Sequence, residues 1–144
     1  MSPEAIFKIL NLIAVTGWLF LIASNWVNRL QKYIPAVIIT LLAMVYTYLI
    51  FSNFQPAELD GFSTLAGVKQ LFSNDRVLLA GWVHYLAFDL LTGCFIVNNA
   101  RKNNINFWLI LPCLFLTFML GPVGLLLYFL LRWMITKNYF SQNF

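Results

Sequence analysis

The stretch Val77–Val97, VLLAGWVHYLAFDLLTGCFIV, decides how this chain folds and where its function is to be sought. It is long and apolar enough to cross about 30 Å of hydrocarbon as a helix. Yet it carries His84, the single histidine of the chain, and Asp89, an acid inside a long apolar run. An ionisable group at membrane depth costs about 2.5–3.5 kcal/mol on insertion, so it marks a functional site by default. We therefore expect function to centre on His84 and Asp89.

Composition extends the membrane interpretation to the whole chain. Of the 144 residues, 61% are hydrophobic and 10% are charged, whereas soluble domains average about 25% charged residues. Four apolar runs are each long enough to span a bilayer. We predict an all-α integral membrane protein, a single domain over residues 1–144, built as an antiparallel bundle of four transmembrane helices: Ala5–Val27, Tyr33–Phe54, Val77–Val97 and Phe107–Trp133.

The connections between the spans differ in length. Asn28–Lys32 and Asn98–Asn106 are short enough to join neighbouring antiparallel helices. The long connection Gln55–Arg76 contains FSTLAGVKQLF, in which apolar residues recur at helical spacing, so we expect a short interfacial helix between spans two and three. With four continuous spans, the lysines and arginines near the span ends divide four to four between the two sides, which leaves the orientation open.

The polar residues of the third span share one side of the helix. At 100° per residue, His84, Phe88, Gly81, Thr92, Tyr85 and Asp89 fall within an arc of about 140°, and the opposite arc is uniformly apolar. We expect the apolar arc to face lipid and the polar arc to face the bundle.

Spans one and four carry matching stripes. In span one, Asn11 and Trp18 lie on a stripe that begins with Glu4 and Lys8, an i,i+4 ion pair. In span four, Thr117, Gly121 and Gly124 lie on another stripe, and the G121-P122-V123-G124 segment predicts a kink and a close approach to the backbone. The three stripes could converge on one internal site. Alternatively, Asn11, Thr92, Thr117 and Tyr85 serve only as interhelical hydrogen-bonding groups.

Several chemistries are excluded by what the sequence lacks. One histidine cannot build a multi-histidine di-iron site or ligate haem on both sides, so we expect no metal. No dinucleotide fingerprint or P-loop occurs, so we expect no cofactor. Basic residues are scattered singly, which gives no support for nucleic-acid binding. The two cysteines, Cys94 and Cys113, lie within apolar spans and are interpreted as small core residues. Cofactor-free acid–base chemistry, or binding and assembly, remains.

Two segments carry a family resemblance. GWVHYLAFDLLTG (Gly81–Gly93) and LPCLFLTFMLGPVGLLLY (Leu111–Tyr128) resemble the abscisic-acid-deficient-4-like integral membrane proteins, which are associated in plants with neoxanthin synthesis. Asn11 and Trp18 in span one and the FSTLAGVKQLF segment are also similar to that family. The resemblance covers nearly the whole chain. It implies a four-span protein that acts on carotenoids, in a step that isomerises a 5,6-epoxy end group to an allene with a tertiary hydroxyl.

The resemblance gives the polar residues candidate roles. Asp89 would be the base, His84 the acid or hydrogen-bond donor, and Tyr85 an assisting group, although the first two roles could be reversed. Residues expected to bind the lipophilic substrate are Asn11, Trp18, Gly81, Trp82, Phe88, Thr92, Thr117, Gly121 and Gly124.

Two other functions remain open on the sequence. The chain could hold a carotenoid or quinone without turning it over, or it could be an assembly subunit or homo-oligomer whose Leu79/Val83/Leu86/Leu90 face contacts protein. We expect membrane lipid as a partner. Because no plastid leader precedes the first span, we expect the bacterial inner (cytoplasmic) membrane as the location.

Overall fold

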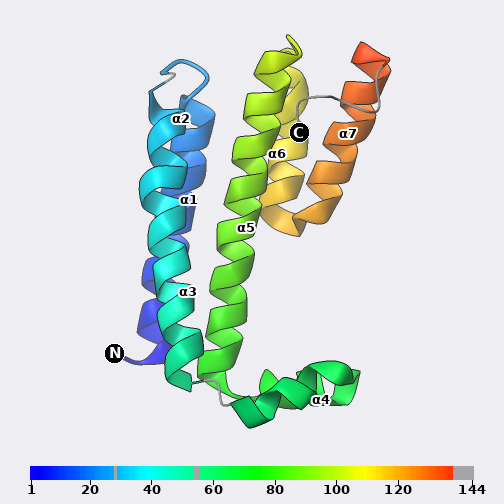
Figure 1. Cartoon of the computed structure of the whole chain (residues 1–144). Helices are drawn as coiled ribbons and strands as arrows, with labels where there is room; N and C mark the ends of the chain where they lie inside the picture. Colours follow the sequence, from blue (N-terminus) through cyan, green and yellow to red (C-terminus); the bar gives the residue numbers. More distant parts are fainter. Residues whose placement is uncertain (28, 54–55, 138–144) are drawn as a thin grey trace.

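The computed structural model of the protein describes residues 1–27, 29–53 and 56–137, and all regular structure in these ranges is helical (Figure 1). The all-α prediction is thus confirmed. The helices are α1 (Pro3–Ala23), α2 (Leu30–Tyr33), the π-helical segment Ile34–Ile39, α3 (Thr40–Asn53), the 3₁₀-helical segment Pro56–Ser63, α4 (Leu65–Leu71), α5 (Asp75–Lys102), α6 (Phe107–Leu120) and α7 (Pro122–Thr136).

Three helices are long and apolar enough to cross a membrane: α1, the continuous helix Leu30–Asn53, and α5. They correspond to the first three predicted spans. Their ends follow ordinary capping chemistry, since the Ser2 hydroxyl accepts a hydrogen bond from the Ala5 amide at the start of α1 and the Asn74 side chain accepts one from Arg76 at the start of α5. At the other end of α5, Lys102 lies in the last turn, where a cation suits the helix dipole.

The fourth predicted span is wrong as a single helix. The chain reverses at Gly121, so that α6 and α7 run side by side as an antiparallel hairpin whose tip lies near the middle of α5 (Figure 1). Gly121 has φ +45°, a left-handed conformation that glycine adopts without a steric penalty. Pro122 follows as the first residue of α7 and has no N–H to continue the hydrogen-bond ladder of α6. The expected kink is therefore a full reversal.

The two arms of the hairpin touch through Gly124. A Cβ atom placed on Gly124 would lie 2.2 Å from the backbone nitrogen and the hydroxyl of Thr117, and 2.4 Å from the carbonyl oxygen of Cys113. Thr117 is fully buried, and its hydroxyl donates to the same Cys113 carbonyl at 2.8 Å. Only glycine therefore fits where α7 crosses α6, and the hairpin depends on it.

Helix α5 is the central element, and its apolar arc is buried. Leu79, Val83, Leu90 and Val97 are at most 4% exposed and belong to the apolar clusters that join α5 to the other helices. The expectation that this arc faces lipid is wrong. Lipid and a protein core are equally apolar, so hydrophobicity does not tell the two surfaces apart, and close packing decides which side is buried.

The polar arc of α5 is only partly covered. The α6–α7 hairpin packs beside the later half of α5, whereas the earlier half is free of it (Figure 1). There His84 and Phe88 are exposed and Gly81 and Tyr85 are half-buried. The polar arc therefore does not face the interior of a four-helix bundle, except at Asp89, which is buried.

The predicted interfacial helix is present as α4. It begins at the Thr64 cap, whose hydroxyl accepts a hydrogen bond from the Gly67 amide, and it lies at the end of the bundle where α5 begins (Figure 1). Leu65 is 87% exposed, as suits a helix lying on a membrane surface. Phe72 anchors this segment to α5, since a Cβ atom on Gly81 would lie 2.6 Å from its ring.

The hairpin can be tested at Gly124. Gly124→Ala introduces a methyl group against backbone atoms that cannot rotate away, so we expect the free energy of unfolding to fall by about 1–3 kcal/mol. The measurement is unfolding of the detergent-solubilised protein by a denaturing detergent, followed by circular dichroism. Leu126→Ala, on the exposed side of α7, is the matched control and should change stability by only a few tenths. Equal effects of the two substitutions would contradict the hairpin.

Candidate functional site

The site is built around Asp89, near the middle of α5. The residue is 7% exposed, and its Oδ2 atom makes no hydrogen bond with any part of the chain that the structure describes. The tip of the α6–α7 hairpin lies directly against the carboxyl group, because a Cβ atom on Gly121 would be 2.5 Å from Asp89 Oδ1. The chain reversal thus brings a backbone without a side chain onto a buried acid.

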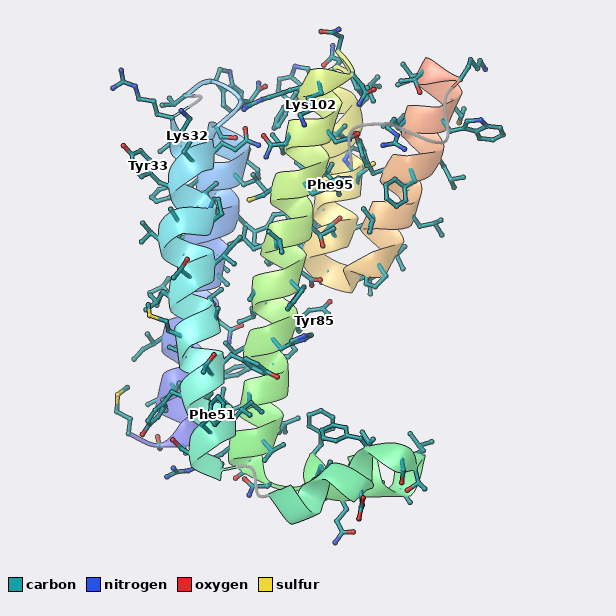
Figure 2. The ribbon with its side chains drawn as sticks, in the orientation of Figure 1. Lys32, Tyr33, Phe51, Tyr85, Phe95 and Lys102 are labelled. Carbon is teal, nitrogen blue, oxygen red and sulfur yellow. The ribbon has the colours of Figure 1, made fainter. Side chains whose placement is uncertain are left out.

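The hairpin tip supplies polar backbone groups to the same place. The tip contains the end of α6, whose last carbonyls lose their helical partners. At the start of α7, Pro122 has no N–H, and the Gly124 and Leu125 amides donate to the Gly121 carbonyl. One of these carbonyls, that of Met119, accepts a hydrogen bond from the Tyr85 hydroxyl at 3.1 Å. Tyr85 precedes Asp89 by one helical turn, and Figure 2 shows it on the side of α5 that faces away from α3. A phenol and a carboxyl group therefore meet at the tip.

A cavity of about 270 Å³ lies beside Tyr85, between α1, α5 and α6, and Asp89 is not among its lining residues. Its lining includes Asn11 and Val15 from α1, Trp82 and Tyr85 from α5, and Met119 from α6. The wall is mostly apolar with a few polar groups, as is typical of sites for small lipophilic molecules. The cavity opens where the sequence predicted that spans one, three and four would converge.

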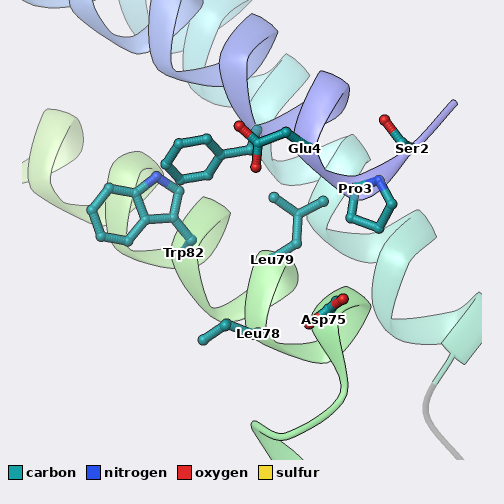
Figure 3. A pocket seen from close by; sticks show the side chains of 8 residues that line it. Ser2, Pro3, Glu4, Asp75, Leu78, Leu79 and Trp82 are labelled. Atoms are coloured by element: carbon teal, nitrogen blue, oxygen red, sulfur yellow. The ribbon is translucent and has the colours of Figure 1, made fainter.

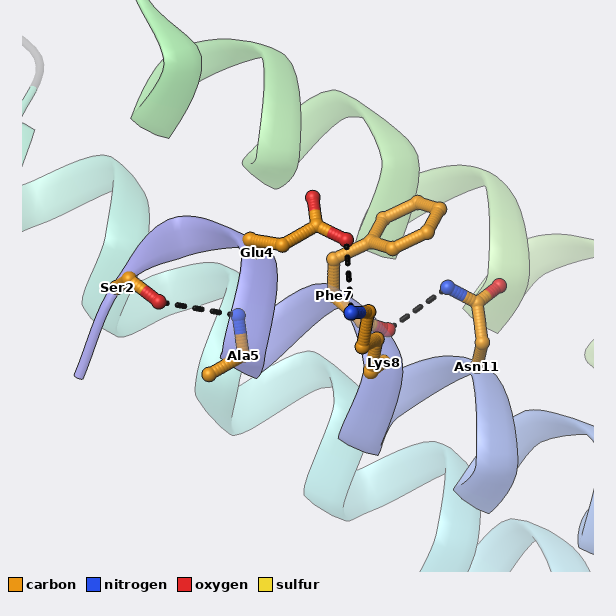
Figure 4. A network of polar contacts seen from close by, with 6 residues as sticks. All are labelled: Ser2, Glu4, Ala5, Phe7, Lys8 and Asn11. Atoms are coloured by element: carbon orange, nitrogen blue, oxygen red, sulfur yellow. Dashed lines mark hydrogen bonds and ion pairs between the residues drawn. The ribbon is translucent and has the colours of Figure 1, made fainter.

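Asn11 connects two of these helices. Its side-chain oxygen accepts a hydrogen bond from the Trp82 indole nitrogen at 3.1 Å, and its side-chain nitrogen donates to the Phe7 carbonyl at 2.7 Å (Figure 4). The Trp82 ring in turn stacks on Tyr85, with 5.6 Å between ring centroids and 26° between planes. Asn11 is thus an interhelical group, as one sequence interpretation held, and it also fixes an aromatic wall of the cavity.

The structure does not bring His84 to Asp89. The His84 ring is exposed and contacts Tyr46 of α3, with 5.6 Å between centroids, and Phe88 of its own helix, with 4.5 Å. Phe88 is 55% exposed and lines neither the Asp89 contact nor the 270 Å³ cavity. These two residues flank the site on the open part of α5.

The remaining expected binding residues hold the helices together. Trp18 is buried, packs edge-on against Phe118 of α6, and lies where a Cβ atom on Gly93 would be 2.7 Å from its ring. Thr92 donates to the Phe88 carbonyl at 2.8 Å within its own helix, so it does not act as an interhelical donor. Thr117 and Gly124 form the contact between the two arms of the hairpin, and Gly81 packs against the Phe72 ring.

A second buried polar cluster was missed by sequence reasoning. The Asn99 side-chain oxygen accepts hydrogen bonds from the Tyr128 hydroxyl at 2.6 Å and from Arg132 at 3.2 Å, and all three residues are at most 2% exposed. The sequence analysis had placed Asn99 in a loop after the third span, whereas α5 continues to Lys102. An asparagine followed by basic residues resembles a loop, and only the return of α7 to this level makes it internal.

These features define a small helical membrane protein with an internal acidic site. They are three apolar helices, a hairpin that turns back beside the central helix, and a buried carboxyl group. The chain belongs to the ABA DEFICIENT 4-like family, whose family model matches residues 5–128. It is 26% identical over 117 residues to the chloroplastic protein ABA DEFICIENT 4 of Arabidopsis thaliana, an alignment that covers 76% of this chain and 50% of that protein. The chain thus spans about half the length of this curated relative.

The family resemblance drawn from the two motif segments is therefore confirmed. Both segments, Gly81–Gly93 and Leu111–Tyr128, lie within the matched residues, and they form the two sides of the contact between Asp89 and Gly121. No solved structure matches the chain significantly.

The contact between Gly121 and Asp89 can be measured by a double-mutant cycle. Gly121→Ala should destabilise the protein for two reasons, the positive φ and the 2.5 Å approach to the Asp89 carboxyl, with a backbone penalty of about 1–3 kcal/mol. Asp89→Ala removes the close approach to the carboxyl group but leaves the positive φ. We expect Gly121→Ala to cost less stability in the Asp89→Ala background than in the unmodified protein. Additive losses, measured by detergent unfolding, would mean that the hairpin tip does not rest on Asp89.

Proposed function

We propose that the protein is a cofactor-independent membrane isomerase that converts an epoxide end group of a carotenoid, or of a related isoprenoid, into an allenic alcohol. Membership of the ABA DEFICIENT 4-like family supports this relationship to neoxanthin-synthase-like proteins. The observation that carries the catalytic part of the proposal is Asp89, a buried carboxyl group with an unpartnered oxygen against the hairpin tip. It lies one helical turn from Tyr85, which lines a lipophilic cavity. An acid at membrane depth needs a task or a partner to justify its cost.

The proposed reaction is balanced without any external reagent. A base removes the proton from the polyene carbon next to the epoxide ring, and the electron pair of that C–H bond forms the new double bond of the allene. The epoxide C–O bond breaks, and its electron pair stays on oxygen. An acid protonates that oxygen to give the tertiary hydroxyl. Substrate and product are isomers, so the site must supply one proton acceptor and one proton donor within reach of each other.

Asp89 and Tyr85 meet these requirements. Asp89 offers Oδ2, which no described group occupies, as the proton acceptor. The Tyr85 hydroxyl is a donor one helical turn away, and it can exchange its bond to the Met119 carbonyl for a bond to the epoxide oxygen. In this proposal Tyr85 takes the donor role that the sequence analysis gave first to His84. His84, on the open face with Phe88, contacts the body of the substrate instead.

The proposal includes an arrangement in the membrane. We infer that α1, Leu30–Asn53 and α5 span the bilayer and that α6–α7 enters and leaves it on the same side, in place of a fourth continuous span. The hairpin tip then lies at membrane depth, where irregular backbone is tolerated only if protein or a polar cavity covers it. Asp89 and Tyr85 would provide that cover.

The hairpin also makes the numbers of lysines and arginines at the two ends of the molecule unequal. It brings Arg132 and Lys137 to the end that carries Lys32 and Lys102 (Figure 2), so six of the nine lysines and arginines lie at that end. By the positive-inside rule, this end faces the cytoplasm. The bacterial inner membrane stays a prediction, because the name of the curated relative places that protein in the chloroplast.

Catalysis is tested by substitution at Asp89. In cells that supply violaxanthin, we expect the unmodified chain to yield a new isomer and Asp89→Asn to yield none, since losing a general base typically lowers a rate by about 10²–10⁴. Pigments are separated by liquid chromatography. Tyr85→Phe should reduce product formation strongly, because the proton donor is lost, whereas His84→Ala should keep most of the activity.

Two further outcomes separate the alternatives. Loss of product in His84→Ala together with full activity in Tyr85→Phe would return the donor role to His84. If neither the unmodified chain nor any variant forms product, and pigment stays on the purified protein, the function is carotenoid binding without turnover. Folding of each variant is checked by its elution in size-exclusion chromatography.

The membrane arrangement has its own test. In a variant with Cys94 and Cys113 replaced by alanine, single cysteines at Asn104, Lys137 and Ser63 are probed with a membrane-impermeant maleimide in intact cells. We expect Asn104→Cys and Lys137→Cys to be protected together and Ser63→Cys to be labelled, since the first two lie at the basic end. A fourth continuous span predicts instead that Lys137→Cys behaves like Ser63→Cys.

A further inference from the structure

A second and larger cavity lies between α1 and α5, nearer the ends of these helices. It encloses about 460 Å³, and its lining includes Glu4 and Phe7 of α1 with Asp75, Leu78 and Trp82 of α5 (Figure 3). Trp82 also lines the 270 Å³ cavity beside Tyr85. The two cavities therefore meet at one indole ring and follow one another along the same pair of helices.

The residues that line the two cavities share one face of each helix. On α5, Asp75, Leu78, Trp82, Tyr85 and Asp89 follow one another at steps of three and four, which places them on one face of the helix. On α1, Glu4, Phe7 and Asn11 do the same (Figure 4). We name the two facing stripes the α1–α5 groove. It runs about 15 Å from the level of Asp75 to that of Tyr85, at 1.5 Å per residue.

Aromatic rings line the groove. Phe7 and Trp82 lie 5.6 Å apart between ring centroids, and Trp82 stacks on Tyr85 at the same distance. Ring faces of this kind suit the flat, apolar body of a conjugated chain. The wall leads to the place where Tyr85 meets the hairpin tip.

The outer end of the groove is acidic. Glu4 and Asp75 both line the larger cavity, and the only ion pair found in the described part of the chain joins exposed Glu4 to exposed Lys8 at 3.5 Å. Carboxylates accept hydrogen bonds from a hydroxyl group. They repel the headgroup of an anionic lipid. The charge at the mouth thus favours a neutral, hydroxylated end group over an anionic membrane lipid.

We propose that the α1–α5 groove binds one elongated isoprenoid with a hydroxylated end ring, placing that ring at Glu4 and Asp75 and the opposite end beside Tyr85 and the hairpin tip. The inference rests on the proposed function for the reaction at Asp89, and it adds a recognition site for the end of the substrate that does not react. Glu4 and Asp75 select the hydroxyl group. Phe7 and Trp82 hold the chain between the two ends.

The test is competitive retention of two pigments that differ in hydroxyl groups. The purified protein is reconstituted in phosphatidylcholine vesicles with equal amounts of zeaxanthin, which carries a hydroxyl on each ring, and β-carotene, which carries none. It is then extracted, repurified and analysed for bound pigment. We expect a preference for zeaxanthin of about tenfold, the size expected for hydrogen bonds to charged acceptors. In the Glu4→Ala/Asp75→Ala double variant the preference should disappear.

Two variants control for correct folding and for the position of the binding site. Asp60→Ala removes an exposed acid at the same end of the molecule but outside the groove, so it should keep the preference. Leu78→Trp fills the larger cavity from a residue that is 52% exposed, so it should lower retention of both pigments without unfolding the protein.

Retention distinguishes this inference from the proposed isomerase activity. Selective retention that depends on Glu4 and Asp75 supports the groove even if no isomer is ever formed. Equal retention of the two pigments, retention of neither, replacement of both by phosphatidylcholine, or a preference that survives in the double variant would each overturn it. If Leu78→Trp isomerises violaxanthin as well as the unmodified protein does, the proposed activity is supported and the proposed role of the groove is contradicted.

Discussion

The reversal of the chain at Gly121–Pro122 is the constraint on which the rest of the structure depends. Backbone carbonyls released at such a turn cannot be left in hydrocarbon, so protein groups must meet them. Tyr85 does this for the Met119 carbonyl, and the absence of a side chain at Gly121 lets the turn lie against Asp89. Asp89, Tyr85 and the turn at Gly121 are therefore one structural unit. Each of them is favourable in its position only because the other two are present.

The position of the turn also divides α5 into two parts with different roles. Beside the hairpin, α5 carries a fully packed interior that includes Val97 and the Asn99 cluster with Tyr128. Before the hairpin tip, the same helix presents Tyr85 and Trp82 to cavities and leaves His84 exposed. A continuous fourth span would have covered this face. The hairpin leaves it accessible, which is what a lipophilic substrate arriving from the bilayer needs.

Hydropathy and apolar spacing predicted the elements whose signals are local. The ends of α1 and α5 follow from Ser2 and Asn74, and α4 follows from apolar spacing after Thr64. The direction of α7 could not be predicted in this way, because an apolar run has the same hydropathy whether it continues or turns back. The Gly121–Pro122 pair signalled an interruption, but a kink and a reversal share that signal.

The sequence predicted the kinds of residue that line the site better than it predicted their positions. Asn11, Trp82 and Tyr85 were expected on converging faces, and they share a cavity with Met119, which no motif pointed to. Whether His84 and Asp89 face one another could not be judged from one helix alone. A helical wheel gives angles but not neighbours, and His84 turns towards Tyr46 of α3 while Asp89 turns towards the hairpin. Tertiary contacts across more than thirty residues decide such matters, and no local pattern contains them.

The distribution of charge bears on why Asp89 is where it is. Among the described residues, Asp89 forms no ion pair with a lysine or arginine, and Arg132, the buried cation on α7, hydrogen-bonds to Asn99. A buried charge without a counter-ion is costly, and an apolar residue of similar size would stabilise the same packing better. Asp89 is therefore poorly explained as a structural group. A role that uses its free oxygen, such as accepting a proton from a bound ligand, accounts for the position without requiring a partner from the protein.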